Sequence, residues 1–188
     1  MHFTLADLVS DITQNGAESG AEVVELEVKE TGGGKKGEFR FTVRDNGKGM
    51  SQEELKRAQD PFFTDGIKHP HRKVGLGLPF LIQTAEQSGG GWEMKSEKGK
   101  GTEICAWFDT ANVDMPPIGD ISGMFRTILL FQGPKEIVIR RSSENKGIDY
   151  ELRKTELVEA LGGLEDTESL LLLNRYLRSE EETEEEDE

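Results

Sequence analysis

The sequence predicts a chain of the α/β class, built from amphipathic helices and paired strands. Residues 4–19 repeat apolar side chains at helical spacing, which indicates a helix with one buried face. Residues 22–30 and 39–43 alternate apolar and polar side chains, which is typical of strands with one buried face. A glycine-rich segment joins these two strands, so we expect them to pair antiparallel. A chain of 188 residues is long enough to bury one substantial core.

The first predicted helix starts with a capping pattern and exposes a polar stripe. Thr4, followed three residues later by Asp7, favours a helix start at this point. Asp11, Asn15 and Glu18 recur at intervals of four and three residues, so they share one stripe beside the apolar face. A solvated polar face explains this stripe, but a carboxylate and an amide are also oxygen ligands suited to Mg²⁺. The sequence leaves both interpretations open.

The second predicted strand ends in a motif rich in aspartate and glycine, Asp45-Asn46-Gly47-Lys48-Gly49-Met50. A strand that ends in Asp-Asn-Gly is first of all a turn signal. The same arrangement also lets the backbone approach a flat ligand while the carboxylate accepts hydrogen bonds from it. Before this strand, residues 31–37 are predicted to form a flexible hairpin loop. After the motif, Ser51 is predicted to cap a short helix over 52–58.

Residues 60–73 interrupt the regular pattern with two prolines, a glycine and mixed charges, which predicts an extended loop. The loop is interpreted either as a functional lid or as a mobile connection. It leads into Val74-Gly75-Leu76-Gly77-Leu78-Pro79 and then into a predicted helix over 80–88, with Phe80 on its apolar face. A glycine turn that enters a helix N-terminus is a favourable place for phosphate. A dinucleotide-binding Rossmann motif is excluded, because no strand precedes this turn.

Two further strands, over 92–96 and 102–108, are predicted to form a hairpin around a turn at 97–101. Thr102 starts the second strand, and its hydroxyl can face either the turn backbone or a ligand. Cys105 lies in the same strand and is the only cysteine, so no internal disulfide can form. We interpret it as a small buried hydrophobic residue.

The C-terminal third has a different character. Residues 114–119 form a proline-containing linker, and Asp120 is predicted to cap a helix over 121–132. Two short strands and two closing helices are predicted over 136–141, 148–153, 155–161 and 166–178. We therefore predict three parts, which are a domain over 1–110, a small C-terminal α/β extension that serves as a partner-docking module over 111–179, and a disordered acidic tail over 180–188.

The net charge of −14 is concentrated at the C-terminus, where eight of the last nine residues are acidic. Outside this tail, 29 acidic residues stand against 23 basic ones. The acidic surplus argues against nucleic-acid binding, which requires clustered Lys and Arg. No apolar run approaches the roughly 20 residues of a membrane helix, and the N-terminus does not resemble a signal peptide. The sequence therefore predicts a cytoplasmic protein without membrane contact, and it does not determine the oligomeric state.

Four signals follow one another in the first part of the chain, and together they resemble the nucleotide-binding domain of the GHKL superfamily. They are Asp11 and Asn15 on a helix, Asp45-x-Gly47-x-Gly49, Gly75-Leu76-Gly77 after the long loop, and Gly99-x-Gly101-Thr102. The superfamily includes DNA gyrase, Hsp90-type chaperones, sensor histidine kinases and MutL-type repair proteins. Asp60-Pro61-Phe62-Phe63-Thr64 is similar to the phenylalanine box of sensor kinases, and the 75–79 segment to their second glycine box. The histidine-kinase branch, or its soluble anti-sigma-factor-like relatives, is the most similar.

The resemblance implies an α+β two-layer sandwich of the Bergerat type, in which helices cover one face of a mixed sheet and hold ATP with Mg²⁺. It implies that Asp45 accepts a hydrogen bond from the adenine amino group and that Thr102 reaches the same edge through water. Asn15 would bind Mg²⁺, and the amides of 75–77 would receive the phosphates. Arg72 and Lys73 are the candidate cations for the β- or γ-phosphate. The full set implied to bind the nucleotide is Asn15, Asp45, Gly47, Gly49, Met50, Phe63, Gly75, Leu76, Gly77, Leu78 and Thr102.

Asp11 is where this sequence departs from the family pattern. It stands where ATP-hydrolysing members have a glutamate base and where sensor kinases often have asparagine. An aspartate is one methylene shorter than a glutamate, and a general base must first reach the attacking water. We therefore keep Asp11 as a candidate catalytic base but do not expect strong hydrolysis.

The predicted ATP domain begins close to Met1, without a preceding helix that could present a substrate histidine. Any phosphoryl transfer is therefore expected to go to a separate protein. The resemblance implies a trans-acting protein kinase of the histidine-kinase type, or a regulator that acts on a partner through its nucleotide state. Two alternatives remain, namely a slow ATPase with a lid-driven clamp cycle and a non-catalytic binding module gated by nucleotide.

Overall fold

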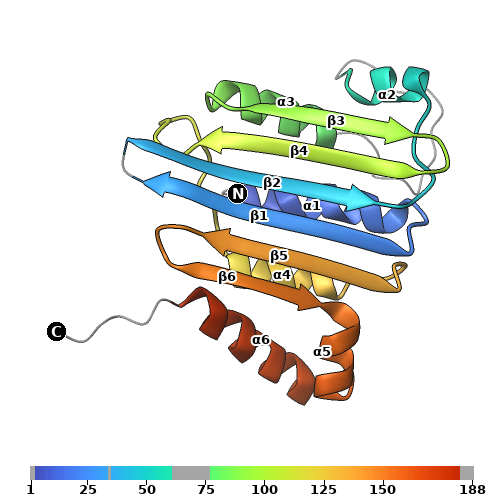
Figure 1. Cartoon of the computed structure of the whole chain (residues 1–188), viewed down its shortest axis with the longest axis vertical. Helices are drawn as coiled ribbons and strands as arrows, with labels where there is room; N and C mark the ends of the chain where they lie inside the picture. Colours follow the sequence, from blue (N-terminus) through green and yellow to red (C-terminus); the bar gives the residue numbers. More distant parts are fainter. Residues whose placement is uncertain (1–2, 34, 61–76, 183–188) are drawn as a thin grey trace.

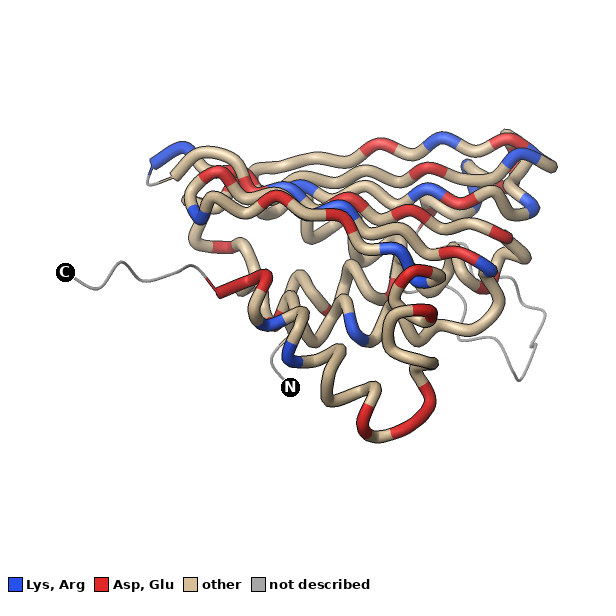
Figure 2. Tube along the Cα trace, turned by 60° about the horizontal axis from the view of Figure 1, so that its bottom comes forward, with Lys and Arg blue, Asp and Glu red and all other residues tan. Residues whose placement is uncertain are grey.

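The computed structural model describes residues 3–33, 35–60 and 77–182. In these residues, six strands form one mixed sheet in the order β3-β4-β2-β1-β5-β6, and helices cover one face of it (Figures 1 and 2). Neighbouring strands are antiparallel except for β1 and β5, which run parallel. The molecule is an α+β two-layer sandwich, which confirms the predicted fold class.

The strands are β1 (Val23–Gly33), β2 (Lys36–Asp45), β3 (Gly91–Glu97), β4 (Gly101–Asp109), β5 (Glu136–Ser143) and β6 (Ile148–Arg153). The helices are α1 (Leu5–Glu18), α2 (Gln52–Ala58), α3 (Gly77–Gln87), α4 (Ile121–Leu129), α5 (Lys154–Leu161) and α6 (Thr167–Glu181). Among the helices of the described segments, none combines the length and the apolar character needed to cross a bilayer.

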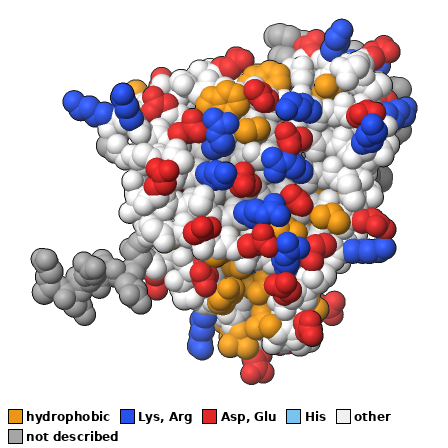
Figure 3. Space-filling view, in the orientation of Figure 1, with side chains coloured by type: hydrophobic (Ala, Val, Ile, Leu, Met, Phe, Trp, Pro, Cys, Tyr) orange, Lys and Arg blue, Asp and Glu red, His pale blue; other side chains and the backbone are white. Residues whose placement is uncertain are grey.

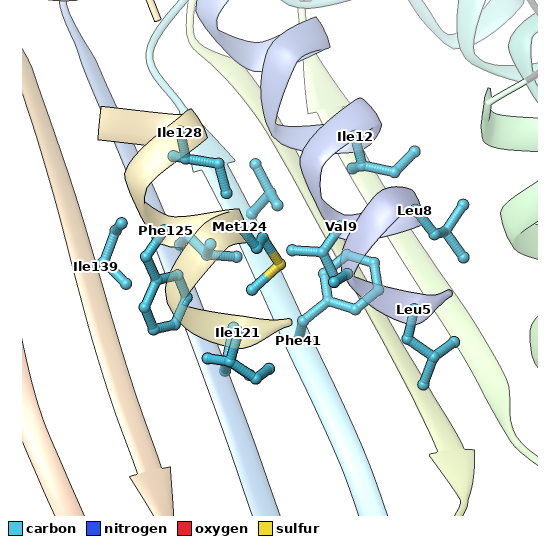
Figure 4. Close-up of a cluster of buried hydrophobic side chains, with 14 of the residues drawn as sticks. Leu5, Leu8, Val9, Ile12, Phe41, Ile121, Met124, Phe125, Ile128 and Ile139 are labelled. Carbon is cyan, nitrogen blue, oxygen red and sulfur yellow. The ribbon is translucent and has the colours of Figure 1, made fainter. Parts of the chain in front are cut away.

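The core lies between the sheet and the helices behind it. Figure 4 shows side chains of α1 and α4, including Val9 and Met124, beside Phe41 of β2. Several of these side chains have no exposed surface at all: Leu5, Leu8, Val9, Phe41, Phe125, Ile128 and Ile139. Burying a side chain of this size contributes about 1.5–3 kcal/mol. Residues from both ends of the chain therefore stabilise one common core.

The opposite face of the sheet is open to solvent and has charges of both signs (Figures 2 and 3). Ion pairs connect neighbouring strands on this face. Arg140 bonds Glu25 at 3.2 Å and Glu151 at 2.9 Å, and Arg44 pairs with Glu103. Exposed pairs of this kind contribute at most about 1 kcal/mol each. The open face is thus a solvated surface that adds little to the stability of the fold.

The predicted helix starts are confirmed where a capping residue is present. Thr4 Oγ1 accepts a hydrogen bond from the Asp7 amide at 3.2 Å, and Asp7 Oδ2 accepts one from the Thr4 amide at 2.9 Å, which completes the capping box. Ser51 caps α2, whose ends coincide with the predicted ones. Asp120 caps α4, again as predicted. These starts depend on contacts within a few residues, which a sequence displays directly.

The prediction of a flexible loop at 31–37 is wrong, because β1 continues to Gly33 and β2 starts at Lys36. The turn between β5 and β6 supports this end of the hairpin. Glu144 Oε2 accepts a hydrogen bond from the Gly32 amide at 2.9 Å, and Asn145 Nδ2 donates to the Gly32 carbonyl. Contacts distant in sequence therefore convert a glycine-rich loop into strand.

Two further predictions in the helices are wrong. Helix α4 ends at Leu129 rather than at 132. The Phe131 carbonyl therefore lies beyond the helix, and it accepts a hydrogen bond from Lys154 Nζ at 2.7 Å. Phe80, predicted to lie on the buried face of α3, is 41% exposed. Its ring meets that of Phe3 edge-on at 4.6 Å, so it covers the N-terminal segment rather than the sheet.

The C-terminal extension adds to the same sheet, because β5 pairs with β1. Arg141 of β5 is fully buried and connects the sheet to α6. Its guanidinium bonds Glu30 Oε1 at 2.5 Å and Glu181 Oε1 at 3.0 Å, and the Tyr150 hydroxyl donates to Glu181 Oε1 at 2.5 Å. Helix α6 continues to Glu181, which makes two of these bonds, and so extends beyond its predicted end at 178. The first residues of the predicted tail are therefore helical.

Candidate functional site

Asp45 is the last residue of β2 and pairs with Thr102 of β4 in the sheet. Its Oδ1 accepts a hydrogen bond from the Gly47 amide at 2.9 Å, which closes the turn after the strand. Ser19, at the end of α1, places its Oγ 3.1 Å from the same oxygen. The carboxylate is therefore oriented by its own turn, and the Ser19 hydroxyl, which also lies 2.7 Å from the Gly16 carbonyl, faces the same oxygen.

Burial raises the pKa of Asp45 above its ordinary value, because the half-buried carboxylate has lost part of its hydration. Hydrogen bonds from Gly47, from Ser19 and from the Thr102 backbone oppose this shift in pKa without cancelling it. A desolvated carboxylate in a fixed orientation is a good acceptor for a donor group on a ligand. Asp45 is thus suited to recognise an amino group.

The glycines after Asp45 are required by close contacts within the chain. A Cβ at Gly47 would lie 1.9 Å from Ser19 Oγ. Gly49 has a φ of +61°, and a Cβ there would lie 2.0 Å from the Glu97 carbonyl oxygen. The turn is therefore packed between the end of α1 and the β3–β4 turn. This gives the two glycines a structural reason besides the predicted approach of a ligand.

Ser96 of β3 connects this turn to Thr102. Its Oγ accepts a hydrogen bond from the Met50 amide at 2.8 Å, and it lies 3.0 Å from the Gly101 carbonyl and 2.9 Å from Thr102 Oγ1. A hydroxyl has a single proton. If Ser96 donates to Gly101, Thr102 must donate to Ser96, and Thr102 Oγ1 then offers acceptor lone pairs to a ligand or water. The sequence analysis did not identify Ser96, although the predicted turn at 97–101 places it opposite Thr102.

Helix α1 brings two predicted parts of the site together. A Cβ at Gly77, at the start of α3, would lie 4.0 Å from Asn15 Nδ2. A Cβ at Gly16, the next residue of α1, would lie 3.5 Å from Asp45 Oδ2. Asp11 is one turn before Asn15 on the same exposed stripe. The C-terminal part of α1 thus adjoins both the first turn of α3 and the Asp45 carboxylate.

Not every predicted site residue can be placed. Leu78 is half-buried and packs against the core from the first turn of α3. Ser19 is a site residue that the sequence analysis missed, because a serine at the end of a helix has no further signal. Five predicted residues lie outside the described part of the chain: Phe63, Arg72, Lys73, Gly75 and Leu76.

The side-chain oxygen of Asn15 fits a Mg²⁺ ion that would be bound mainly by the phosphate oxygens of a nucleotide. Among the described residues there is no group of three or more His, Cys, Asp and Glu side chains that could hold a metal. Mg²⁺ does not need such a group, because it keeps several waters and takes one or two protein oxygens together with phosphate oxygens. Asn15 offers such an oxygen on an exposed face, beside a helix N-terminus that favours phosphate.

Comparison with known proteins agrees with this geometry. The chain is 32% identical over 85 residues to the sensor histidine kinase ZraS of Escherichia coli (strain K12), which is 45% of the chain and 17% of that protein. It is 37% identical over 62 residues to sporulation kinase C of Bacillus subtilis (strain 168), which is 33% of the chain and 14% of that protein. The matched parts are less than a fifth of these relatives' own length. Residues 3–112, more than half of the chain, match the model of the histidine kinase-, DNA gyrase B- and HSP90-like ATPases, and the chain belongs to this family.

Proposed function

We propose that this protein binds ATP with Mg²⁺ and acts on a separate protein, either by phosphorylating it or by controlling it through the nucleotide state. The observation that supports this proposal best is the position of Asp45. Its fixed, partly desolvated carboxylate stands beside Thr102 at one end of α1, and Asn15 lies near the start of α3. An adenine amino group would donate to Asp45, and the phosphates would extend toward α3 with Mg²⁺ on Asn15.

In the kinase form of the proposal, transfer depends on positioning and on neutralisation of phosphate charge. Asn15 would contribute by holding Mg²⁺, and the α3 N-terminus by its amides. Arg72 and Lys73 remain the candidate cations for the transferred phosphate. Two relatives are named as kinases, which favours transfer over simple binding. We place the protein in the cytoplasm as part of the same proposal.

Calorimetric titration with Mg-ATP tests the binding step. We expect one nucleotide per chain and weaker binding of Mg-GTP, because guanine presents a carbonyl acceptor where adenine presents an amino donor to Asp45. The absence of heat with every adenine nucleotide would exclude the proposal.

Incubation with γ-labelled ATP and candidate partner proteins tests the transfer step. Label on a partner supports the kinase form. Tight ATP binding without label on any partner excludes transfer to those partners, and a partner that binds only the nucleotide-bound protein then supports the regulatory form.

A slow ATPase is the second candidate, because Asp11 lies one turn from Asn15 on the exposed stripe of α1. If Asp11 activates water, Asp11→Asn should abolish phosphate release and leave ATP affinity unchanged. Phosphate release that survives this substitution would exclude Asp11 as the base.

A further inference from the structure

The tip of the β1–β2 hairpin gathers lysines that have no carboxylate partner. Lys35 and Lys36 lie in this tip, and Lys146 lies in the β5–β6 turn, which contacts the tip through the hydrogen bond from Asn145 to Gly32. All three lysines are exposed, and among the residues that the structure describes none of them forms an ion pair. We call these three lysines the basic cluster.

The acidic side chains near the basic cluster already have partners. A pocket of about 290 Å³ opens beside the two lysines of the hairpin, and Glu38 and Asp109 also line it. Glu38 Oε1 bonds Arg40 at 2.7 Å, and Asp109 Oδ1 accepts a hydrogen bond from the Ala111 amide at 2.9 Å. Glu144, in the β5–β6 turn, accepts one from a backbone amide of β1 at 2.9 Å. Each of these carboxylates thus has a partner, whereas the ammonium groups of the basic cluster have none within the described chain.

The last residue of α6 lies at the same end of the sheet. Glu181 bonds Arg141, which in turn bonds Glu30 of β1. Glu30 is three residues before Gly33, which pairs with Lys36 in the hairpin, so about 10 Å of strand separates it from the tip. Figures 1 and 2 show the end of α6, the hairpin tip and the β5–β6 turn together at one end of the molecule.

The sequence beyond α6 is strongly acidic. Glu182 follows the helix with an extended backbone, at φ −77° and ψ 118°, so the chain leaves the helix axis there. Residues 183–188 read Thr-Glu-Glu-Glu-Asp-Glu and contain no basic residue. Six extended residues span about 20 Å, which is twice the length of strand between Glu30 and the hairpin tip. The acidic segment is therefore long enough to reach the basic cluster.

We propose that residues 183–188 fold back onto the basic cluster and form an intramolecular strap over the hairpin tip. A single exposed ion pair contributes at most about 1 kcal/mol. The strap, however, offers several carboxylates to three lysines, and its attachment to α6 gives it an effective concentration in the millimolar range that is typical of short tethers. It closes a site that an acidic segment of another protein would otherwise occupy, so such a partner must displace it.

The strap and the nucleotide site lie at opposite ends of β2. This strand runs from Lys36 to Asp45, a distance of about 30 Å. A full-length variant in which amides replace the carboxylates of the strap should therefore bind Mg-ATP like the wild-type chain. We call it the amide variant, and its substitutions are Glu184→Gln, Glu185→Gln, Glu186→Gln, Asp187→Asn and Glu188→Gln. Failure of this proposal would leave the proposed function untouched.

Coupling with a carbodiimide, which joins a carboxylate to an amine only where the two are in contact, tests the proposal on the full chain. We expect peptide mapping to find residues 184–188 linked to the basic cluster. Lys56 is the matched control, because this exposed lysine of α2 lies at the Asp45 end of the sheet and should give about tenfold fewer links to a tether of this length. Salt at about 1 M reduces the Debye length to about 3 Å and should abolish the links. A mixture of isotopically light and heavy protein shows whether each link lies within one chain.

Amide chemical shifts give a second test that does not depend on coupling chemistry. The wild-type chain and the amide variant should differ at 31–37 and 144–147, and about 1 M salt should remove the difference. A synthetic peptide with the sequence of residues 183–188 should shift the same amides in the amide variant, and Lys35→Gln combined with Lys36→Gln should weaken this effect. Identical spectra of the two chains, links between separate chains, or links to Lys56 as frequent as those to the basic cluster would overturn the proposal.

Discussion

The Ser96 hydroxyl lies 2.9 Å from the Thr102 hydroxyl and accepts a hydrogen bond from the Met50 amide at 2.8 Å. One side-chain oxygen thus links the turn after β2 to the first residues of β4. When Ser96 donates its single proton to the Gly101 carbonyl, Thr102 donates to Ser96 and keeps its lone pairs for a ligand or water.

Ser96→Ala should destabilise the fold by about 1–3 kcal/mol, because it leaves the Met50 amide and the Gly101 carbonyl without this partner. It should also weaken Mg-ATP binding, since Thr102 is then free to turn. Urea denaturation and calorimetry measure the two effects. Ser142→Ala, which changes a half-buried serine of β5, should alter neither quantity. Equal behaviour of the two variants would show that Ser96 does not organise the site.

Asp45→Asn should weaken Mg-ATP binding by about 1.5–3 kcal/mol, roughly ten- to a hundredfold in Kd. The Asn carbonyl oxygen can replace Oδ1 and accept from the Gly47 amide, but the amide NH₂ then faces the adenine amino group, donor against donor. Calorimetry with matched protein preparations measures the change. Unaltered affinity would mean that Asp45 does not contact the base.

The same substitution tests the sign of the pKa shift at Asp45. Because burial raises the pKa of Asp45 in the folded state, the folded chain binds this proton more tightly than the unfolded chain does. The contribution of Asp45 to stability is therefore present at low pH and is lost as the pH rises through the raised pKa. At neutral pH, Asp45→Asn should unfold at the same temperature as the wild-type chain or higher. A clear fall in Tm would contradict the assigned direction.

ATP affinity should fall on acidification through the raised pKa of Asp45, because the protonated acid no longer accepts from the adenine amino group at both oxygens. Kd measured against pH for the wild-type chain should show this loss. Asp45→Asn should show a flatter profile, since the titrating group is absent. Parallel profiles for the two proteins would assign the pH dependence to another group.

Gly101→Ala and Gly99→Ala form a matched pair in one turn. Both glycines have positive φ, at +114° and +83°, but a Cβ at Gly101 would lie 1.9 Å from the Asp45 carbonyl oxygen while a Cβ at Gly99 meets nothing within 4 Å. We expect Gly99→Ala to cost about 1–2 kcal/mol of stability from backbone conformation alone. Gly101→Ala should cost more and should also lower ATP affinity, because Asp45 must move. Urea denaturation and calorimetry distinguish the two, and equal costs would contradict the contact.

Arg141→Ala should destabilise the chain by about 3–5 kcal/mol, because it removes a fully buried cation and leaves the largely buried carboxylates of Glu30 and Glu181 without it. Burial and the adjacent Glu181 raise the pKa of Tyr150, so its hydroxyl stays neutral and continues to donate to Glu181, but it does not replace the positive charge of Arg141. The control is Arg44→Ala, which removes an exposed pair with Glu103 and should cost less than about 1 kcal/mol. Urea denaturation measures both. Similar losses would show that the Arg141 cluster is not a buried ion-pair network.

Local signals determine how much of the fold the sequence predicts. The ends of α2 follow from the Ser51 cap, and the β3–β4 hairpin follows from two alternating runs around a glycine turn. The parallel pairing of β1 with β5 has no such signal, because alternation shows that a strand has a buried face but not which strand lies beside it. The last residue of α6, Glu181, pairs with Arg141, which is distant in sequence, and the pattern of α6 alone does not reveal this contact.

The candidate site likewise combines residues that a sequence motif reveals with residues that only the fold brings to the site. Asp45 and the glycines around it are visible as a motif, and Asn15 as part of a helical stripe. Ser19 and Ser96 act only because folding places them against Asp45 and Thr102, so their residue types alone predict nothing. The packing reason for Gly47, a contact with Ser19, likewise appears only in three dimensions.

The parallel contact between β1 and β5 also sets an order of events during synthesis. Val24 pairs with Ile137, so β1 remains a strand with one unpaired edge until most of the chain has left the ribosome. Strands with open edges are prone to join other chains, and long-range pairing is slow to form. A polypeptide cut at residue 112, where the family match ends, would keep that edge open permanently. Residues that follow the family match thus cover one edge of a strand that lies inside it.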